Sequence, residues 1–253
     1  CKYLVVVLNG SPFTGAADIF EPTDNYIAAA QPYDTSCGLT IHGNNNNNVI
    51  HGGAGNDTIY GYDGEDILVG DGDTTSGSGD DTIYGGDDFD TIVGDVFIGN
   101  GSGNDTLYGE GGGDVIIGDS ENGIGTGNDI IDGGDGDDQI VGDSFIGDSS
   151  GNDTINGGAG NDRITGDTSD GLGSGNDILK GGDGDDIITG DTGRGTGSGN
   201  DIIHGDAGND GLIGDSTFDL GTGNDIIYGD DDNDTIWGDS ESGDGTGNDT
   251  IYG

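Results

Sequence analysis

Aspartate recurs at fixed positions through most of this 253-residue chain, and its regular spacing indicates repeated cation binding. Two columns of aspartates each stand two residues before an aliphatic residue, and each column repeats every 24 residues. The first column is Asp57, Asp81, Asp105, Asp129, Asp153, Asp177, Asp201, Asp225 and Asp249. The second column is Asp66, Asp90, Asp114, Asp138, Asp162, Asp186, Asp210 and Asp234.

Stacked repeats would place the carboxylates of one column roughly 5 Å apart, where like charges repel by several kcal/mol per pair at an effective dielectric constant of about 20. Ca²⁺ takes about six to eight hard oxygen ligands, which carboxylates and backbone carbonyls supply. The surrounding glycines let the backbone turn tightly and aim its carbonyls inward. We therefore expect calcium ions between successive repeats, where they would turn the repulsion into a cross-link.

A third column of aspartates, each preceded by glycine, follows the second aliphatic segment of every repeat. It comprises Asp71, Asp95, Asp119, Asp143, Asp167, Asp191, Asp215 and Asp239. Two interpretations stay open: each aspartate caps its own turn, or the column adds metal ligands in the longer loop. The expected load is therefore roughly two to three Ca²⁺ per repeat.

Composition supports a chain that needs cations to fold. There are 51 acidic residues against four Lys and Arg, which gives a formal net charge of -47. This charge excludes nucleic acid as a partner, and no stretch approaches the roughly 20 apolar residues of a membrane-spanning helix. No zinc-protease motif, nucleophile elbow or phosphate-binding loop occurs, so we expect no enzymatic activity.

The elements that must position these aspartates are short strands. Eight complete repeats span residues 55–246, and a partial repeat follows at 247–253. Each repeat divides into nine-residue and fifteen-residue steps, and each step contains one short aliphatic segment. We predict an all-β fold, a parallel β-solenoid in which every 24-residue coil contributes two short strands.

The nine-residue step carries a family resemblance. The segment GGAGNDTIY at residues 52–60 resembles the repeats-in-toxin (RTX) nonapeptide, and the cadence covers residues 43–253. The resemblance implies a calcium-bound parallel β-roll in which aspartates and glycine carbonyls hold Ca²⁺ between turns. The first nine-residue block, at 43–51, has Asn48 in place of the aspartate and should bind a cation more weakly.

Residues 1–42 lie outside the repeat and are predicted to cap the stack or to dock onto another molecule. They include a predicted strand at 4–8 and one short helix within 16–33. Cys1 and Cys37 could pair in an oxidising compartment, and a modified Cys1 is the alternative. At the other end, the partial repeat suggests that the chain continues or that a second copy completes the stack head to tail.

Two side-chain rows are expected on the outer faces of the coils. Alternation along the second strand predicts an outward row that consists of Val69, Val93, Ile117, Val141, Thr165, Thr189, Ile213 and Trp237. The apolar residues of the longer loop, such as Phe97 and Ile98, either pack under the loop or make lateral contacts.

These features predict an extracellular or cell-surface protein, a calcium-rigidified rod that belongs to a self-assembling filament or adhesin. Its partners would be further copies of itself and an unidentified surface ligand. One alternative is ice binding, because the recurring GTGND loop resembles the ice-binding face of calcium-dependent antifreeze repeats. Another alternative is the carboxy-terminal folding module of a secreted enzyme.

Overall fold

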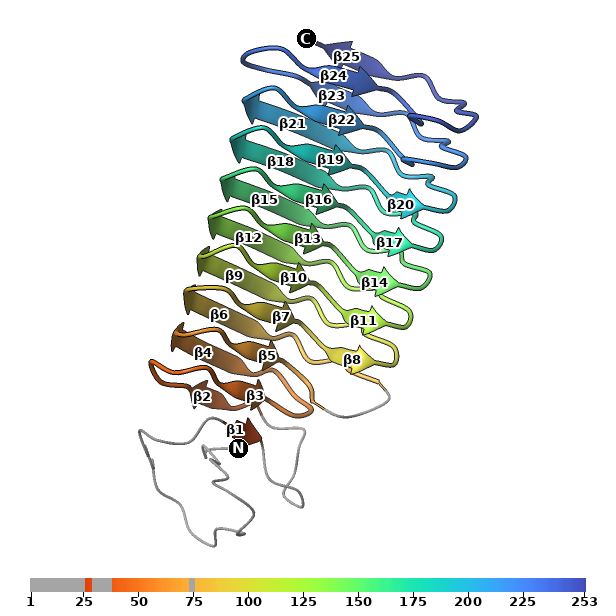
Figure 1. The fold of residues 1–253 in the computed structure, drawn as a ribbon. Coiled ribbons are helices and arrows are strands. Elements are labelled where there is room, and N and C mark those ends of the chain that lie inside the picture. The colour runs from red at the N-terminus through yellow and green to blue at the C-terminus, as the bar shows by residue number, and fades with distance from the viewer. Residues whose placement is uncertain (1–25, 29–37, 73–75) are drawn as a thin grey trace, which may run out of the picture.

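The computed structural model describes residues 26–28, 38–72 and 76–253. The described residues form a solenoid of stacked coils that rises from the N-terminal strands to β25 (Figure 1). All regular elements in these ranges are β-strands, and they pair in parallel, so the predicted all-β solenoid is confirmed. No helix in the described part of the chain is long and apolar enough to cross a membrane.

The described strands form three parallel sheets that run along the axis of the solenoid. The first sheet consists of β2 (Thr40–His42), β4 (Thr58–Asp63), β6 (Thr82–Asp87), β9 (Thr106–Gly111), β12 (Ile130–Asp135), β15 (Thr154–Ala159), β18 (Ile178–Asp183), β21 (Ile202–Ala207), β23 (Ile226–Tyr228) and β25 (Thr250–Tyr252). The second sheet consists of β1 (Tyr26–Ala28), β3 (Val49–His51), β5 (Ile67–Val69), β7 (Thr91–Val93), β10 (Val115–Ile117), β13 (Gln139–Val141), β16 (Arg163–Thr165), β19 (Ile187–Thr189), β22 (Gly211–Ile213) and β24 (Thr235–Trp237).

A thin aliphatic stack holds the first two sheets together. One buried aliphatic side chain points inward from each strand from β2 to β23 in these two sheets, and its register partner lies one coil away, as in the pairs Ile59–Ile83 and Ile116–Ile140. These side chains are fully or almost fully buried through most of the rod. Because each coil contributes only two of them, the apolar core of one coil is small and depends on its neighbours.

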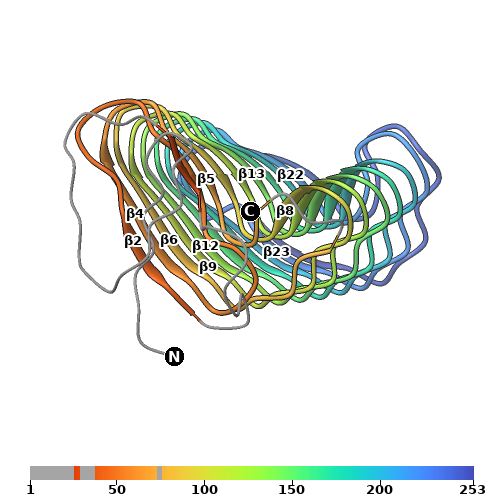
Figure 2. The same ribbon diagram turned by 90° about the horizontal axis from the view of Figure 1, so that it is seen from below.

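The longer loop contains a third sheet, which the sequence did not predict. It consists of β8 (Val96–Ile98), β11 (Ser120–Asn122), β14 (Ser144–Ile146), β17 (Thr168–Asp170) and β20 (Thr192–Arg194). Viewed along the axis, these loops form a second lobe beside the first two sheets (Figure 2). The first residue of each of these strands is buried, which gives the lobe an interior of its own.

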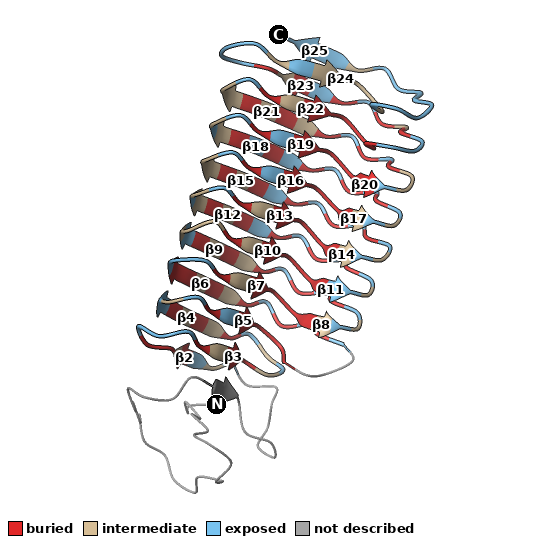
Figure 3. Cartoon of the chain, viewed as in Figure 1, coloured by how far each residue is buried: buried red, intermediate tan, exposed pale blue. Residues whose placement is uncertain are grey.

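The second lobe corrects one prediction about the surface. The row from Val69 to Ile213 is buried rather than outward-facing, and only Trp237, in the last strand of the second sheet, is partly exposed. The buried colour at the ends of these strands continues into the adjoining loop segments (Figure 3). The prediction was wrong because alternation assumes that nothing covers the outer side of a strand, whereas here the loop turns back and supplies a second interior.

Only part of the N-terminal prediction can be compared with the structure. β2 lies within the predicted cap, yet it pairs with β4 in the register of the repeats, so the stack begins before residue 43. Within the segment predicted to contain a helix, the described residues 26–28 form strand β1, which pairs with β3. The predicted strand at 4–8, Cys1 and Cys37 lie outside the described residues.

Candidate metal centres

The first column of aspartates is a chain of hydrogen bonds from coil to coil. The backbone N–H of Asp57 donates to Oδ1 of Asp81 at 2.6 Å, and the N–H of Asp81 donates to Oδ1 of Asp105 at 2.7 Å. From Asp57 to Asp225 the side chains are almost completely buried, and Oδ2 of each has no hydrogen-bond partner among the described residues. One oxygen therefore holds the stack together, while the other is left for a ligand.

The second column repeats this arrangement at the opposite, shorter loop. The N–H of Asp66 donates to Oδ1 of Asp90 at 2.8 Å, and the N–H of Asp90 donates to Oδ1 of Asp114 at 2.7 Å. Oδ2 is again buried without a partner from Asp66 to Asp210. Asn48 occupies the corresponding place in the first coil, and its Oδ1 accepts the N–H of Asn44 at 2.7 Å.

Glycine leaves room for a ligand beside each unpaired oxygen. A Cβ placed on Gly94 would overlap both the carbonyl oxygen of Gly118 and Oδ2 of Asp105. On the shorter side, a Cβ on Gly61 would overlap the carbonyl oxygen of Gly85 and Oδ2 of Asp66. Each hollow is thus lined by a carboxylate oxygen and a carbonyl oxygen, which are the hard donors that Ca²⁺ prefers.

The third column uses its two oxygens in different ways. Oδ2 of Asp95 accepts the N–H of Gly103 at 2.9 Å, and Oδ2 of Asp119 accepts the N–H of Gly127 at 2.7 Å. These bonds span eight residues and close the longer loop, rather than capping a turn at the aspartate itself. Oδ1 of every member from Asp71 to Asp239 has no described hydrogen-bond partner, so the ligand role predicted for the column remains open to it.

The structure brings the first and third columns together. The carboxylates form groups of three in which the candidate ligand atoms lie within 4.8 Å of one another. These groups include Asp71–Asp81–Asp95, Asp95–Asp105–Asp119, Asp119–Asp129–Asp143 and Asp143–Asp153–Asp167. The second column stands apart, and the charged neighbours of Asp90 are Asp66, Asp88 and Asp114.

Burial opposes ionisation of these carboxyl groups. Desolvation raises the pKa of Asp81 to about 9 and that of Asp90 to about 8, although the backbone hydrogen bonds they accept lower both pKa values. The pKa values of Asp129 and Asp153 are raised well above the usual value. Burial is the largest cause, and the negative charge of neighbouring aspartates is the next largest. A bound divalent cation would reverse this penalty by supplying the missing opposite charge.

The donor set therefore fits calcium. Carboxylate and carbonyl oxygens meet in buried hollows, and an ion there would neutralise charges that no described basic side chain reaches. The predicted ligands at the C-terminal end are less enclosed: Asp234, Asp239 and Asp249 are partly exposed. Asp234 and Asp249 still accept the N–H groups of Asp210 and Asp225 at 3.1 Å.

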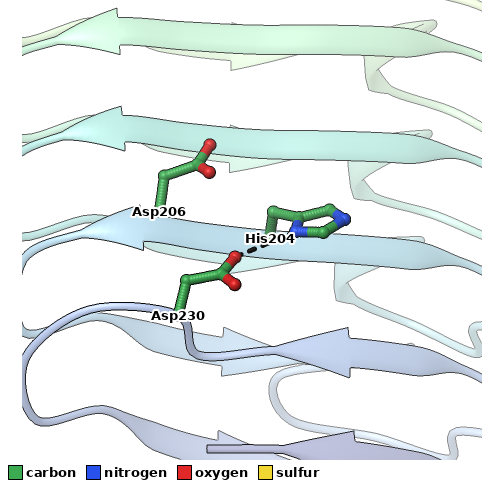
Figure 4. Close-up of side chains that lie close together, drawn as sticks. All are labelled: His204, Asp206 and Asp230. Atoms are coloured by element: carbon green, nitrogen blue, oxygen red, sulfur yellow. Dashed lines mark hydrogen bonds and ion pairs between the residues drawn. The ribbon is translucent and has the colours of Figure 1, made fainter.

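One cluster of a histidine and two aspartates was not predicted, because its members lie outside the three aspartate columns. Nδ1 of His204 lies 2.9 Å from Oδ2 of Asp230, and Asp206 is close to both (Figure 4). Asp206 and Asp230 have φ angles of 67° and 66°, at a position where several other coils have glycine. Aspartate tolerates this left-handed conformation better than most residues. The cluster lies at the surface, apart from the buried aspartate columns.

The comparison with protein families agrees with this geometry. The model of the RTX calcium-binding nonapeptide repeat (4 copies) matches at residues 42–74, 75–96, 101–124, 125–146, 148–170, 173–196, 196–220 and 211–242. These segments cover most of the chain and nearly all of the described solenoid. A search of curated proteins gave no match. The chain therefore belongs to the family of RTX calcium-binding nonapeptide repeats.

Proposed function

We propose that this chain is an extracellular structural protein, a rod that calcium folds and stiffens. The observation that carries the proposal is the repetition of buried carboxylate oxygens without hydrogen-bond partners, coil after coil, on both sides of the core. The RTX solenoid is a structural fold, and we assign this chain a mechanical rather than a catalytic role. The residues that would hold calcium are the aspartates of the columns and the glycine carbonyls beside them.

The chain's own residues define a folding switch. Without cations, the self-repulsion of a chain with net charge -47 opposes collapse. When calcium is bound it supplies the positive charge between the coils. The backbone N–H groups that already bind one oxygen of each aspartate then fix the carboxylates in place. Calcium outside cells is abundant enough to fill sites of moderate affinity, which supports an extracellular location.

We propose that copies of the rod associate into a surface filament or adhesin. The longer loops expose apolar side chains, and Ile98 is 75% exposed. The other exposed apolar residues of these loops include Ile124, Ile146, Leu172 and Leu220. Polar residues of neighbouring coils lie between them, as Asn122 does between Ile98 and Ile146, and we assign lateral contacts to these separate apolar side chains. Head-to-tail contacts would continue the parallel sheets from one copy to the next.

Circular dichroism and analytical ultracentrifugation with and without Ca²⁺ test this proposal. The calcium-loaded chain should show β-structure and sediment as a rod or as its oligomers, while the chelated chain should lose both properties. If the calcium-loaded protein stays monomeric at every concentration, the proposed filament is refuted. If the circular dichroism spectrum does not change on chelation, the proposed calcium-dependent folding is refuted as well.

A second candidate function is calcium-dependent ice binding, which one observation favours. An exposed row of amides forms a regular ladder, in which Nδ2 of Asn128 donates to Oδ1 of Asn104 at 3.0 Å and Nδ2 of Asn152 donates to Oδ1 of Asn128 at 3.0 Å. A parallel row of Ser and Thr runs beside it, with Thr126 and Ser150 as members. Measurement of thermal hysteresis in calcium-containing buffer decides this candidate, because an ice-binding face must lower the freezing point below the melting point.

A further inference from the structure

The nonapeptide accounts for one aspartate on each side of a coil, yet the two sides of this solenoid are not equivalent. On the side of the longer loop, the first column meets the third column, and three carboxylates converge. On the shorter side, the second column has only its own members and exposed loop residues as charged neighbours. The difference lies in the number of buried negative charges available to one ion.

The three converging carboxylates are held before any ion arrives. In the group Asp95–Asp105–Asp119, Asp105 accepts the N–H of Asp81 at 2.7 Å through Oδ1. Asp95 and Asp119 each accept the N–H of a loop glycine through Oδ2. The remaining oxygen of each has no described partner, and all three side chains are at most 1% exposed. Buried carboxylates that crowd together in this way can stay ionised only beside a cation.

The groups also overlap along the axis. Asp95 belongs to the group with Asp71 and Asp81 and to the group with Asp105 and Asp119. Asp119 interacts with the carboxyl groups of both its third-column neighbours, Asp95 and Asp143. Asp95, Asp119 and Asp143 each belong to two successive groups, whereas the first-column members of these groups, Asp81, Asp105, Asp129 and Asp153, each belong to one.

We propose that the longer-loop side holds a continuous row of divalent-cation sites, which we call the longer-loop file. One first-column aspartate and two successive third-column aspartates form each site. Neighbouring sites share the third-column carboxylate that lies between them. Each coil adds one first-column and one third-column carboxylate, so one divalent ion per coil neutralises the file. The first and third columns thus take one ion together rather than one each. This inference rests on the proposed calcium binding and assigns it a total of two ions per coil.

Affinity should differ between the two sides, because calcium affinity increases with the number of charged ligands. The longer-loop file, with three carboxylates around each ion, should fill first. The shorter-loop file, with one column of carboxylates, should fill at higher calcium concentration. Calcium titration of the full-length, metal-stripped chain should therefore resolve a tight class and a weak class of similar size.

Sharing predicts unequal losses from equivalent substitutions. Asp119→Asn removes a carboxylate placed between two sites, so the tight class should lose two ions. Asp71→Asn changes the same column, but Asp71 belongs to one described group, so one ion should be lost. Asp114→Asn, in the second column, should leave the tight class complete and remove one weak ion. Asparagine keeps a side-chain oxygen that can accept the backbone hydrogen bonds.

Isothermal titration calorimetry combined with elemental analysis of the calcium-loaded variants counts these ions, and circular dichroism in saturating calcium checks the fold. Equal losses from Asp119→Asn and Asp71→Asn would overturn the sharing of carboxylates. A tight ion lost from Asp114→Asn would overturn the difference between the sides. If Asp119→Asn does not fold, Asp71→Asn and Asp66→Asn provide the comparison of sides. Wild-type protein that binds no calcium would instead refute the proposed function itself.

Discussion

At the scale of single residues, the two oxygens of each buried aspartate have separate tasks. Oδ1 of Asp81 accepts a backbone N–H from the preceding coil, while its Oδ2 has no described partner and lies beside Gly70. A side chain with one satisfied and one free oxygen stiffens the backbone and presents a ligand at the same time. The glycine opposite is part of this arrangement, because any Cβ would fill the hollow.

Gly94→Ala tests that hollow. The new methyl group would overlap the Gly118 carbonyl and Oδ2 of Asp105, so we expect a loss of about 1–3 kcal/mol in the free energy of unfolding together with weaker calcium binding. Gly111→Ala is the control, because the nearest atom to its Cβ, Oδ1 of Asp87, would be 3.6 Å away. Chemical denaturation at fixed calcium measures both variants. Equal stabilities for the two would show that the space beside Gly94 is not required.

Acidification should partly replace calcium in stabilising the folded state. Burial raises the pKa of Asp66 to about 7 and that of Asp90 to about 8, both above the unfolded value of 3.8. Protons therefore favour the folded state, and this contribution is complete below about pH 4 and disappears as the pH rises through about 7–8. Metal-stripped protein should gain β-structure when it is acidified from pH 8 to pH 4, as followed by circular dichroism. A loss of structure on acidification would contradict the assigned burial.

At the scale of elements, the rod consists of strands that cannot be stable alone. A three-residue strand such as β13 contributes one side chain, Ile140, to the aliphatic stack and a second, Val141, to the interior of the longer-loop lobe. Partly exposed rings on the first sheet help to keep the coils in register: Tyr60, Tyr84 and Tyr108 stack with neighbouring ring centroids 4.9 Å apart. Each interaction connects one coil with the next, so stability accumulates along the axis.

A pair of substitutions on β13 tests the second interior. Val141→Asp would bury a carboxylate that has no partner, and we expect a loss of about 3 kcal/mol or more in the free energy of unfolding. Gln139→Asp, two residues earlier on the same strand and partly exposed, should change stability by no more than about 0.5 kcal/mol. Thermal unfolding at saturating calcium compares them. Similar effects of both variants on the free energy of unfolding would contradict the burial of Val141 and support the predicted outward position.

The period of the sequence was enough to predict the solenoid and the three aspartate columns, because stacking forces residues 24 apart into register. It did not predict β8 and its equivalents or the burial of Val69 and Val93. Both depend on how the longer loop folds back, and the loop has no apolar alternation of its own: Ser120 and Thr168 take the buried positions that Val96 occupies elsewhere. The meeting of Asp81 with Asp71 and Asp95 was likewise not predicted, because it depends on the path of that loop.

At the scale of the whole molecule, the repeats are modules with nearest-neighbour contacts. Deletion of residues 127–150 removes one complete repeat and joins Thr126 to Gly151, which restores the same local sequence. We expect this variant to fold in calcium with an unchanged β-spectrum per residue and to bind the ions of one coil fewer. Deletion of residues 127–138, half of a repeat, should prevent folding because it shifts every later strand out of register. Two deletions that fold equally well would contradict the stacked architecture.

The dependence of the fold on calcium is tested most directly by small-angle X-ray scattering of the full chain with calcium and after chelation. We expect a radius of gyration of about 18 Å for the calcium-loaded monomer and about 55 Å for the expanded chelated chain, by the scaling of compact and unfolded chains of this length. The change should reverse when calcium is restored. A chelated sample at neutral pH that keeps the compact radius would contradict the claim that cations between the coils hold the molecule together.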